Sequence, residues 1–513
     1  MSKKNLDLSI YLVTNSEMVP NGISFLDQVS AAIDNGVTVV QLREKDLDTR
    51  TFIERAKQVK KLTDKAGIPL IINDRVDIAL AVDAHLHVGQ SDMDAREARQ
   101  ILGDDKIIGV SASTIPEIEQ AIKDGADYVG IGICYDTTTK KSEKIPMGPI
   151  GSHPLLEVIK KSGSGMKACL IGGINQSNIQ KVRYGAGLPG FPLDGVAVVS
   201  CIMAKEDAGK ATRELVELWN TPPAWTKTLD VSKNVEIGDL IKNTRKVNPM
   251  CHNITNGVAK HFAANVTLAI GASPIMSECY QEFDDLASFP NTGLVLNTGT
   301  ATSENIAVYL KATAAYNKAG KPIVYDPVGA GATSYRKWVT KKLLTEAHFT
   351  VIKGNHGEIY TAAGKEMKMK GVDSESSKLT DVIQVVKELS IRSRSVVVAT
   401  GEVDVIADGI FGGKIDLTED DVKNQQAVVI KGGHELMGRI TTSGCALGSV
   451  IVGSVAANPE NVFMATVAAC ALYKKAGELA GAKASGPGSF EWMFLDELDK
   501  CSRSGSFAEI SKL

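Results

Sequence analysis

Short apolar runs alternate with amphipathic segments along the first 220 residues of the chain. Eight of these runs are rich in β-branched residues and have the length of buried strands. They are SIYLV (9–13), VTVVQL (37–42), PLIIN (69–73), HLHVG (85–89), KIIGVS (106–111), DYVGIG (127–132), KACLIGG (167–173) and DGVAVVS (194–200). Each is followed by a segment with helical periodicity or a helix cap. Eight β-α units predict a closed (β/α)8 TIM barrel, whose active site lies at the C-terminal ends of the strands.

The second half of the chain also has an α/β pattern, but its apolar runs are more continuous. The strand and loop candidates are VTLAIGASPIM (266–276), GLVLNTGT (293–300), KPIVYDPVG (321–329), FTVIKGN (349–355), SVVVATG (395–401) and VDVIADG (403–409). Continuous apolar strands are typical of a parallel sheet that is covered on both faces. We therefore predict an open, doubly wound α/β layer.

Between the halves, residues 219–234 read WNTPPAWTKTLDVSKN and interrupt the periodic pattern with adjacent prolines and polar residues. Such a segment indicates a linker between two hydrophobic cores. We predict a first domain over residues 1–224, a linker over 225–235 and a second domain over 236–513.

The composition narrows the classes of function. With 43% hydrophobic residues, 23% charged residues and a net charge of -3, the chain is typical of a globular protein and lacks the charge that would attract nucleic acid or anionic lipid. Its partners are expected to be small molecules or other subunits. The N-terminus lacks the pattern of a signal peptide and no apolar run approaches the ~20 residues of a membrane span, so we expect a cytoplasmic protein. Eight scattered cysteines without a CxxC pair predict neither a zinc knuckle nor a disulfide framework.

Polar residues follow seven of the predicted barrel strands. Arg43 and Lys45, two apart in extended chain, can point the same way and bind phosphate oxygens. Asp74 and Asp92 are carboxylates of the kind that holds Mg²⁺. The late strand ends IGG and VAVVS stand where barrels bind a monophosphate through backbone N–H groups. The sequence thus predicts a site for two phosphorylated ligands.

The motifs QLREKD, INDR, HVGQSD, TTTK and IGG with GVAVVS resemble the thiamine phosphate synthase family over roughly residues 8–218. That family joins hydroxymethylpyrimidine pyrophosphate to hydroxyethylthiazole phosphate and releases pyrophosphate. The resemblance implies pyrimidine pyrophosphate contacts at Gln41, Arg43, Lys45, Asn73, Ser111 and Lys140, thiazole phosphate contacts at Thr137, Thr139, Gly173, Val199 and Ser200, and Mg²⁺ ligands at Asp74 and Asp92. Arg43 and Lys140 are the implied catalytic cations.

The implied reaction is dissociative: pyrophosphate leaves, and the thiazole nitrogen captures the pyrimidine carbocation. Many cationic donors and no evident nucleophile fit this chemistry, because stabilisation of a leaving group is electrostatic. The chain departs from bacterial members at GICYD (132–136), where a GP dipeptide usually precedes the aromatic residue.

The second half carries four short motifs that suggest a phosphate site. DPVGAGAT (326–333) combines a carboxylate with a glycine loop, KGNHGEI (353–359) spaces an asparagine and a glutamate as NxxE, ATG (399–401) ends a strand, and TTSGC (441–445) opens a helix. Unpaired N–H groups at a helix N-terminus bind anions. No GxxxxGK[ST] motif is present, so a P-loop enzyme is excluded. NxxE resembles the Mg²⁺-organising element of ribokinase-like kinases.

CHNITNGVAKHFAAN (251–265), LAIGASPIM (268–276), LVLNTGT (294–300), VYDPVGAGAT (324–333) and ATGEVDVIADG (399–409) resemble hydroxyethylthiazole kinases over roughly residues 236–498. The resemblance implies a ribokinase-like fold, ATP as co-substrate and Mg²⁺. The implied positions are Asn256, Met276, Gly299 and Gly444 for the thiazole, Lys353, Asn355 and Thr400 for ATP, and Asp326 and Glu358 for the metal. Lys353 stands where arginine is common, and Thr442 replaces the first glycine of TGxGC.

Cys445 matches the position where most ribokinase-like kinases carry an aspartate as general base. A free thiol has a pKa of about 8.5 and is mostly protonated at neutral pH, although a helix N-terminus can lower that pKa. Phosphoryl transfer depends mainly on positioning and electrostatics, so a poor base suffices. We interpret Cys445 as a weak base or a shape-filling neighbour of the hydroxyl; an inert cysteine at a helix start is the alternative.

The order of synthase then kinase resembles the bifunctional thiamine biosynthesis enzymes of fungi, and implies self-association through the kinase domain as a trimer or hexamer. Two other interpretations stay open. A phosphate-binding aldolase-type barrel fused to a sugar or pyrimidine kinase would need a Schiff-base lysine on a strand, whereas Lys45 and Lys140 lie in predicted loops. A thiamine-precursor sensor would bind ligands without turnover and has less need for metal ligands.

Overall fold

The computed structural model describes residues 5–137, 145–226, 235–365 and 379–513. The chain forms two compact units, one of Met1–Pro222 with Ile415–Thr418 and the other of Pro223–Lys414 with Glu419–Leu513. Trp225 belongs to the second unit, where its ring stacks on that of His348 with centroids 5.0 Å apart. Most of the predicted linker, residues 227–234, lies outside the described residues.

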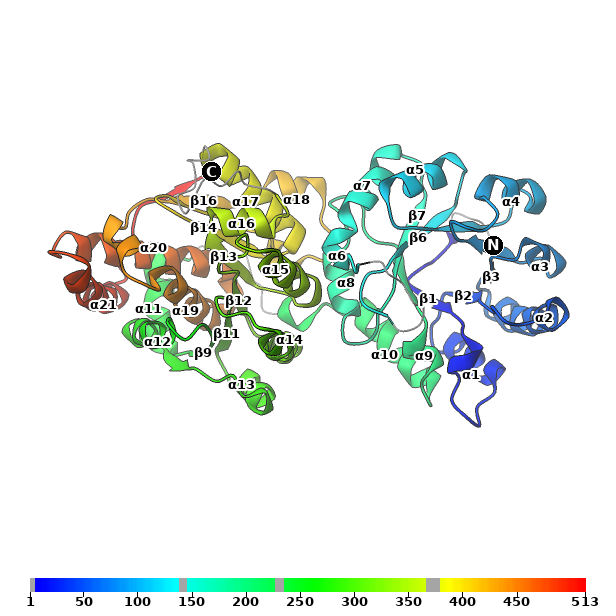
Figure 1. Ribbon diagram of the computed structural model, residues 1–513, viewed down its shortest axis with the longest axis horizontal. Coiled ribbons are helices and arrows are strands. Elements are labelled where there is room, and N and C mark those ends of the chain that lie inside the picture. The colour runs from blue at the N-terminus through cyan, green and yellow to red at the C-terminus, as the bar shows by residue number, and fades with distance from the viewer. Residues whose placement is uncertain (1–4, 138–144, 227–234, 366–378) are drawn as a thin grey trace. The chain divides into compact units, whose positions relative to one another are not determined.

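The first unit is a closed barrel of eight parallel strands, β1 to β8 in sequence order, in which β8 returns to pair with β1 (Figure 1). The strands are β1 (Ile10–Val13), β2 (Val39–Leu42), β3 (Leu70–Asn73), β4 (His85–Val88), β5 (Ile108–Ala112), β6 (Tyr128–Gly132), β7 (Lys167–Ile171) and β8 (Gly195–Val198). The helices are α1 (Phe25–Ile33), α2 (Thr49–Ala66), α3 (Val76–Ala81), α4 (Ala95–Leu102), α5 (Ile115–Lys123), α6 (Gly148–Gly151), α7 (His153–Ser162), α8 (Ile179–Gly185), α9 (Ser200–Met203) and α10 (Ala208–Asn220). All eight predicted strands and the TIM-barrel prediction are confirmed.

Local signals in the sequence set the helix ends. The Asp48 side chain accepts a hydrogen bond from Thr51 N at 3.1 Å and starts α2, and Gly67, with a φ of 70°, caps its C-terminal end. Thr114 and Glu117 form a capping box that starts α5. One hydrophobic core lies between strands and helices, and a smaller one fills the barrel interior.

The second unit is built on a nine-stranded sheet in the order β10-β9-β11-β12-β13-β14-β15-β16-β17. The strands are β9 (Met250–Ile254), β10 (Ser273–Ile275), β11 (Thr292–Asn297), β12 (Ile323–Asp326), β13 (Val351–Asn355), β14 (Val396–Thr400), β15 (Asp404–Ala407), β16 (Ala427–Ile430) and β17 (Ile510–Lys512). The pairs from β10 to β14 are parallel, and the pairs from β14 to β17 are antiparallel.

The prediction of a parallel sheet is therefore wrong for its last strands. Only residues 401–403 separate β14 from β15, too few for the crossover that a parallel pair needs. The run VTLAIGASPIM is also only partly a strand, because its first four residues end helix α12 (Lys260–Ala269) and the strand is Ser273–Ile275. Strands β9, β16 and β17 were not among the predicted strands.

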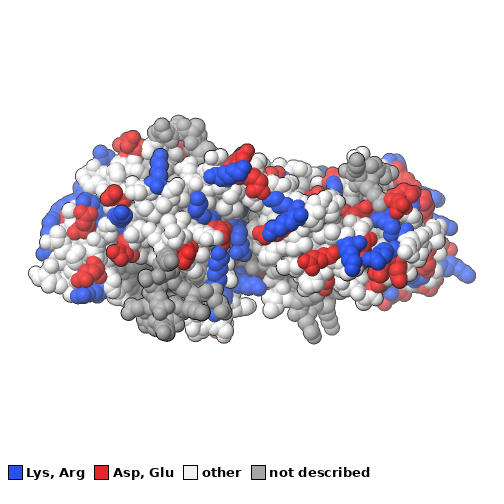
Figure 2. Space-filling model, turned by 90° about the horizontal axis from the view of Figure 1, so that it is seen from above, with Lys and Arg blue, Asp and Glu red and all other residues white. Residues whose placement is uncertain are grey.

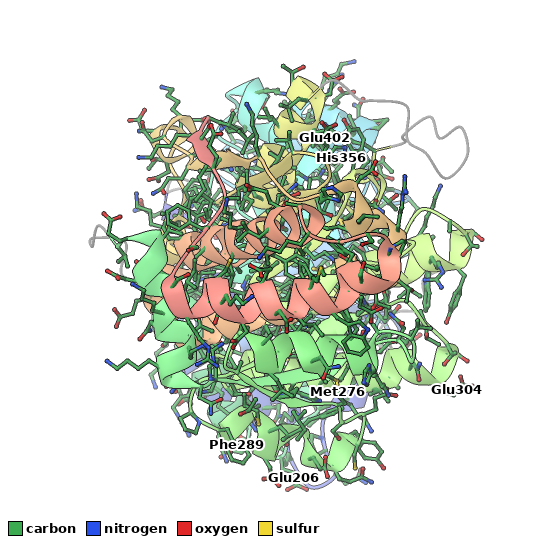
Figure 3. All side chains as sticks on the ribbon, turned by 90° about the vertical axis from the view of Figure 1, so that its left-hand side faces the viewer. Glu206, Met276, Phe289, Glu304, His356 and Glu402 are labelled. Atoms are coloured by element: carbon green, nitrogen blue, oxygen red, sulfur yellow. The ribbon has the colours of Figure 1, made fainter. Side chains whose placement is uncertain are left out.

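Helices cover both faces of this sheet. They are α11 (Ile237–Val247), α12, α13 (Phe283–Ser288), α14 (Ser303–Lys318), α15 (Ser334–Glu346), α16 (His356–Ala362), α17 (Leu379–Ser393), α18 (Glu419–Lys423), α19 (Ser443–Ala457), α20 (Val462–Gly481) and α21 (Pro487–Ser504). Residues of α11, α12, α19, α20 and α21 form the core on one face, seen from the helix side in Figure 3. Residues of α13, α14, α15, α16 and α17 form the core on the other face.

In the described part of the chain no single helix is long and apolar enough to cross a membrane. The neighbouring helices α19 and α20 reach that length and composition only as a pair bent by 111°. On the face shown in Figure 2, basic and acidic side chains are intermingled.

Candidate active sites

The described residues predicted for the barrel site lie at the C-terminal ends of its strands. Gln41 is in β2, Asn73 ends β3, Ser111 is in β5, and Arg43, Lys45, Asp74, Asp92, Thr137, Gly173, Val199 and Ser200 stand in the segments that follow strands. Since all strands of the barrel are parallel, these ends open on one face of the unit. Thr139 and Lys140 lie outside the described residues.

Two carboxylates and a lysine meet at this face. Lys45 Nζ forms an ion pair with Asp74, whose carboxyl group neighbours that of Asp92. Burial, and then the neighbouring Asp74 carboxyl group, raises the pKa of Asp92 above its usual value. Asp92 Oδ2 also accepts a hydrogen bond from Gly89 N at 2.8 Å. Facing carboxylates of this kind favour a cation between them.

Glycine is required where the β7 loop approaches the loop after β6. Gly173 has a φ of 65°, and a Cβ atom there would lie 2.4 Å from Asp136 O. This close approach brings the backbone of the predicted monophosphate loop beside Asp136, the neighbour of Thr137.

A row of polar side chains inside the barrel was not predicted. Gln41 Nε2 donates to Tyr11 Oη at 2.5 Å, and Tyr11 Oη lies 2.7 Å from Tyr128 Oη. His87 Nδ1 lies 2.9 Å from Tyr128 Oη, and His87 Nε2 lies 2.9 Å from Ser111 Oγ. Burial lowers the pKa of His87 to about 4, so the imidazole is neutral at neutral pH. The row connects Gln41 to Ser111, two residues that are predicted to contact the pyrimidine.

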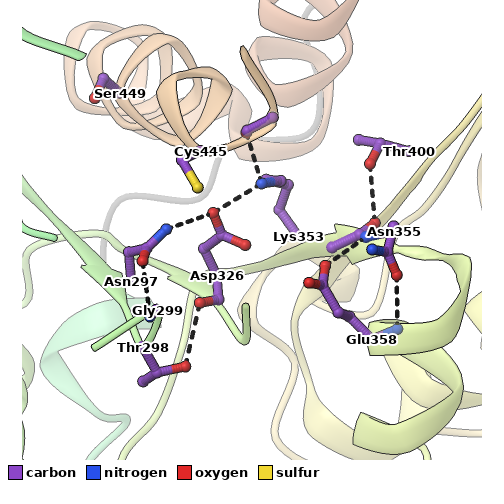
Figure 4. A network of polar contacts seen from close by, with 12 residues as sticks. Asn297, Thr298, Gly299, Asp326, Lys353, Asn355, Glu358, Thr400, Cys445 and Ser449 are labelled. Atoms are coloured by element: carbon purple, nitrogen blue, oxygen red, sulfur yellow. Dashed lines mark hydrogen bonds and ion pairs between the residues drawn. The ribbon is translucent and has the colours of Figure 1, made fainter. Parts of the chain in front are cut away.

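In the second unit, a buried ion pair joins the end of β12 to β13. Lys353 Nζ lies 2.8 Å from Asp326 Oδ2 and also donates to Gly444 O at 2.7 Å (Figure 4). Asn297 Nδ2 donates to the same Asp326 oxygen at 2.9 Å. Burial alone would lower the pKa of Lys353, but the Asp326 carboxylate raises it above its ordinary value. Lys353 thus stays charged and ties β13 to the first turn of α19.

The NxxE motif is a capping box at the start of α16. Asn355 Oδ1 accepts from Glu358 N at 2.9 Å, and Glu358 Oε2 accepts from Asn355 N at 2.8 Å (Figure 4). Glu358 Oε1 accepts from Gly329 N at 2.9 Å, so the glutamate also holds the glycine loop after β12. Burial raises the pKa of Glu358. Thr400 Oγ1 donates to Gly354 O at 3.2 Å beside this motif.

Asn297, which was not predicted, contacts three of the predicted site residues: Asn256, Gly299 and Asp326. Its Oδ1 accepts from Asn256 Nδ2 at 3.2 Å and from Gly299 N at 2.9 Å. Asn256 Nδ2 also lies 3.8 Å from Cys445 Sγ. The LNTGT run that holds Asn297 ends a strand before a glycine, which is the signal that could have identified it.

Two family models match the chain, one in each of the two units. The model described as "Thiamine monophosphate synthase" matches residues 10–202, and the model described as "Hydroxyethylthiazole kinase family" matches residues 241–504. The chain is 42% identical over 511 residues to the "Probable thiamine biosynthetic bifunctional enzyme" of Schizosaccharomyces pombe, which covers 97% of this chain and 95% of that protein. The chain belongs to the family of thiamine biosynthetic bifunctional enzymes.

Further matches agree with this family. The "Thiamine biosynthetic bifunctional enzyme" of Saccharomyces cerevisiae is 40% identical over 528 residues, with 97% of this chain and 96% of that protein covered. The "Thiamine-phosphate synthase" of Clostridium tetani is 44% identical over 223 residues, 43% of this chain and 100% of that protein. The barrel is thus the synthase domain and the second unit is the kinase domain, with ATP as its co-substrate. The predicted resemblance, fold class and pair of activities are confirmed.

In the kinase domain, Cys445 lies in the first turn of α19. Burial, followed by the nearby Asp326 carboxylate, raises the pKa of Cys445 above its usual value, so the helix N-terminus does not make it a thiolate. Thr442, the residue before α19, has a φ of 66°, a left-handed conformation in which glycine is favoured. The loop keeps the conformation of a glycine although it carries threonine.

A second buried lysine fixes the turn after β14. Lys474 on α20 donates to Gly401 O and Glu402 O, both at 2.8 Å, and lies 3.3 Å from Asp404 Oδ1. Lys474 therefore holds the backbone of the turn that directly follows Thr400. Met276 directly follows β10, the strand paired with β9, and is half-buried against the core of α11, α12 and α19 to α21; Figure 3 shows it well apart from His356.

Both sites contain carboxylates that fit Mg²⁺. In the barrel these are Asp74 and Asp92. In the kinase domain Asp326 Oδ1 is buried without a hydrogen-bond partner in the described residues, and Glu358 is its acidic neighbour. No group of three or more metal-ligating side chains occurs in the described ranges. One or two carboxylates are what Mg²⁺ needs when substrate phosphates supply further ligands.

Proposed function

We propose that the two domains of this enzyme catalyse consecutive steps at the sites described above. The kinase domain transfers the γ-phosphoryl group of ATP to the hydroxyl of hydroxyethylthiazole. The barrel joins the resulting thiazole phosphate to hydroxymethylpyrimidine pyrophosphate and releases pyrophosphate. One observation carries the residue assignment: each domain gathers charged side chains at its predicted phosphate site. The kinase domain has a buried cation–carboxylate pair at the start of α19, and the barrel has facing carboxylates with Lys45 at its strand ends.

In the barrel, the residues support a reaction in which the leaving group departs first. Arg43 and Lys45 neutralise negative charge that grows on the pyrophosphate as its bond to the pyrimidine methylene breaks. Asp74 and Asp92 would hold Mg²⁺, which supplies further positive charge to the phosphates. Thr137, Gly173 and the start of α9 hold the thiazole phosphate so that its ring nitrogen faces the carbocation. Lys140 completes the cationic set in this proposal.

In the kinase domain, the free N–H groups at the start of α19 bind the transferred phosphoryl group. Asn256 and Gly299, arranged by Asn297, bind the thiazole substrate. Asn355 and Thr400 contact ATP, and Asp326 and Glu358 would hold Mg²⁺, which lowers the negative charge that the acceptor oxygen meets. Since its thiol is neutral, Cys445 positions the substrate hydroxyl and accepts its proton only weakly.

For Lys353 we propose a role other than the contact with ATP that was expected from the sequence. Its ammonium group is already bound by Asp326 and Gly444 O, so we propose that it sets the position of the α19 start and the charge beside the phosphates. We further propose a cytoplasmic enzyme that self-associates through its kinase domain, as a trimer or hexamer. Light scattering of the purified chain measures the oligomeric state.

The test supplies purified enzyme with ATP, Mg²⁺, hydroxyethylthiazole and hydroxymethylpyrimidine pyrophosphate, and follows thiamine phosphate by mass. We expect product that requires ATP. Asp326→Asn should stop it unless thiazole phosphate is supplied, whereas Asp74→Asn should stop it with either thiazole. A mixture of the two variants should restore product, because each retains one working site. Ligand binding without turnover at either site would instead favour the sensor interpretation.

A further inference from the structure

The row of polar side chains inside the barrel has no place in the reaction proposed above. Tyr11, Tyr128 and His87, here called the interior row, are at most 7% exposed and stand between Gln41 and Ser111. The interior of a small parallel barrel is usually filled with branched apolar residues. Burying three polar side chains there is costly unless each is hydrogen-bonded, and here every one has a partner on both sides.

The barrel makes room for this row. A Cβ atom at Gly109 on β5 would lie 2.0 Å from Tyr128 Cζ and 2.4 Å from its hydroxyl oxygen. Only a glycine at that position lets the Tyr128 ring cross the interior and reach both Tyr11 and His87. The space, the glycine and the unbroken hydrogen bonds point to a built connection rather than to polar residues that happen to be buried.

If every hydrogen of the row is used in a hydrogen bond, the bonds take one direction, set by the Gln41 end. Gln41 Nε2 donates to Tyr11, so the hydroxyl hydrogen of Tyr11 is left for Tyr128 Oη. The hydrogen of Tyr128 then goes to His87 Nδ1, which assigns the single hydrogen of the neutral imidazole to Nε2. The His87 Nε2 hydrogen is donated to Ser111 Oγ. Ser111 therefore keeps its own hydroxyl hydrogen for a ligand, and Gln41 keeps its Oε1 acceptor.

We propose that the interior row sets the hydrogen-bonding polarity of the pyrimidine subsite and so selects an aminopyrimidine. Its three members are positioning residues: they hold Gln41 as an acceptor and Ser111 as a donor, and they touch no reacting atom. An aminopyrimidine carries an amino N–H donor and ring-nitrogen acceptors, which are the partners that an acceptor at Gln41 and a donor at Ser111 require. In the corresponding oxo ring the order is reversed, because the oxygen accepts and the neighbouring ring nitrogen donates. The inference rests on the proposed contacts of Gln41 and Ser111.

The experiment measures selectivity with the full chain. Inhibition constants against synthase turnover are determined for hydroxymethylpyrimidine monophosphate, which has no pyrophosphate to lose, and for its counterpart with an oxo group in place of the amino group. The wild-type enzyme should prefer the amino ligand. Tyr128→Phe, which removes one hydroxyl and interrupts the row, should reduce that preference about tenfold, the size expected for one mismatched hydrogen bond. Kinase turnover of the same preparation reports that the chain is intact.

Controls separate a positioning role from a structural one. Tyr184→Phe removes a hydroxyl from a buried tyrosine on α8, outside the row, and should leave the preference unchanged. In the background of Ser111→Ala, Tyr128→Phe should have little further effect on the preference for the amino ligand. The effects of the two changes on that preference should therefore be far from additive. Loss of affinity for both ligands to the same extent in Tyr128→Phe would overturn the proposal. Unchanged selectivity in Ser111→Ala and Gln41→Ala would instead overturn the pyrimidine contacts on which it rests.

Discussion

Replacing Lys353 with methionine removes the cationic partner of Asp326 in the described part of the kinase domain. The Lys353 side chain is 4% exposed and that of Asp326 is 1% exposed, so water cannot replace the lost ammonium group. Methionine fills nearly the same volume, which keeps the cavity cost small. The change therefore isolates the effect of a buried carboxylate without its counter-charge.

Two interactions disappear together in Lys353→Met. The carboxylate of Asp326 loses its ion pair at 2.8 Å, and Gly444 O loses its hydrogen bond at 2.7 Å. Breaking a buried pair from one side costs about 3 to 5 kcal/mol. We expect a loss of that size in the stability of the kinase domain. Lys365→Met is the matched control: its ion pair with Glu388 is about 40% exposed on both sides and is worth about 0 to 1 kcal/mol.

Hydrogen exchange followed by mass spectrometry measures this loss locally. Amides of β12 and β13 should exchange faster in Lys353→Met, while amides of the barrel strands should be unchanged. Adding Asp326→Asn should recover much of the stability, because neither member of this pair then carries a charge, although kinase activity should stay low. A change in β12 and β13 no larger than in Lys365→Met would refute the reasoning and show that the pair is solvated or that Asp326 is protonated.

Other predictions concern single residues. Cys445→Ala should lower the kinase kcat less than tenfold and keep the wild-type pH profile between about pH 6 and 8, since a raised pKa leaves the thiol neutral; a loss of several orders of magnitude would identify an essential thiolate. Asp92→Asn should lower synthase turnover at least a hundredfold and weaken its dependence on Mg²⁺, while kinase turnover is kept; equal loss of both activities would indicate misfolding instead. Thr442→Gly should stabilise the kinase domain by about 0.5 to 1 kcal/mol in urea unfolding, because it relieves a left-handed threonine, and a lower stability would contradict that account.

Much of the barrel could be predicted from the sequence because its strands are apolar runs that end in polar motifs. Each predicted strand occurs, and the chain order of the strands is also their spatial order. The kinase sheet was harder, since a central strand is apolar whether its neighbour is parallel or antiparallel. The signal for the β14–β15 hairpin was the length of the connection, three residues from Gly401 to Val403.

Side chains that act through partners could not be predicted. His87 and Tyr128 alternate with apolar residues in their strands and are indistinguishable from core positions until the barrel closes. Lys353 lies in the middle of strand β13, and its partner Asp326 is 27 residues earlier in the chain. Asn297 was missed for the same reason: its importance lies in the residues that it brings together.

The paired apolar helices α19 and α20 have a consequence for the synthesis of the chain on the ribosome. They follow strands β9 to β16 in the sequence, so the sheet that buries them has already been made when they emerge. At about 5 to 20 residues per second, their 15 and 20 residues are complete within a few seconds. A gene arrangement that moved these helices ahead of their strands would expose them to the machinery that recognises membrane segments. Circular permutants that begin near Thr442 should therefore misfold or mislocalise more often than permutants opened within the barrel.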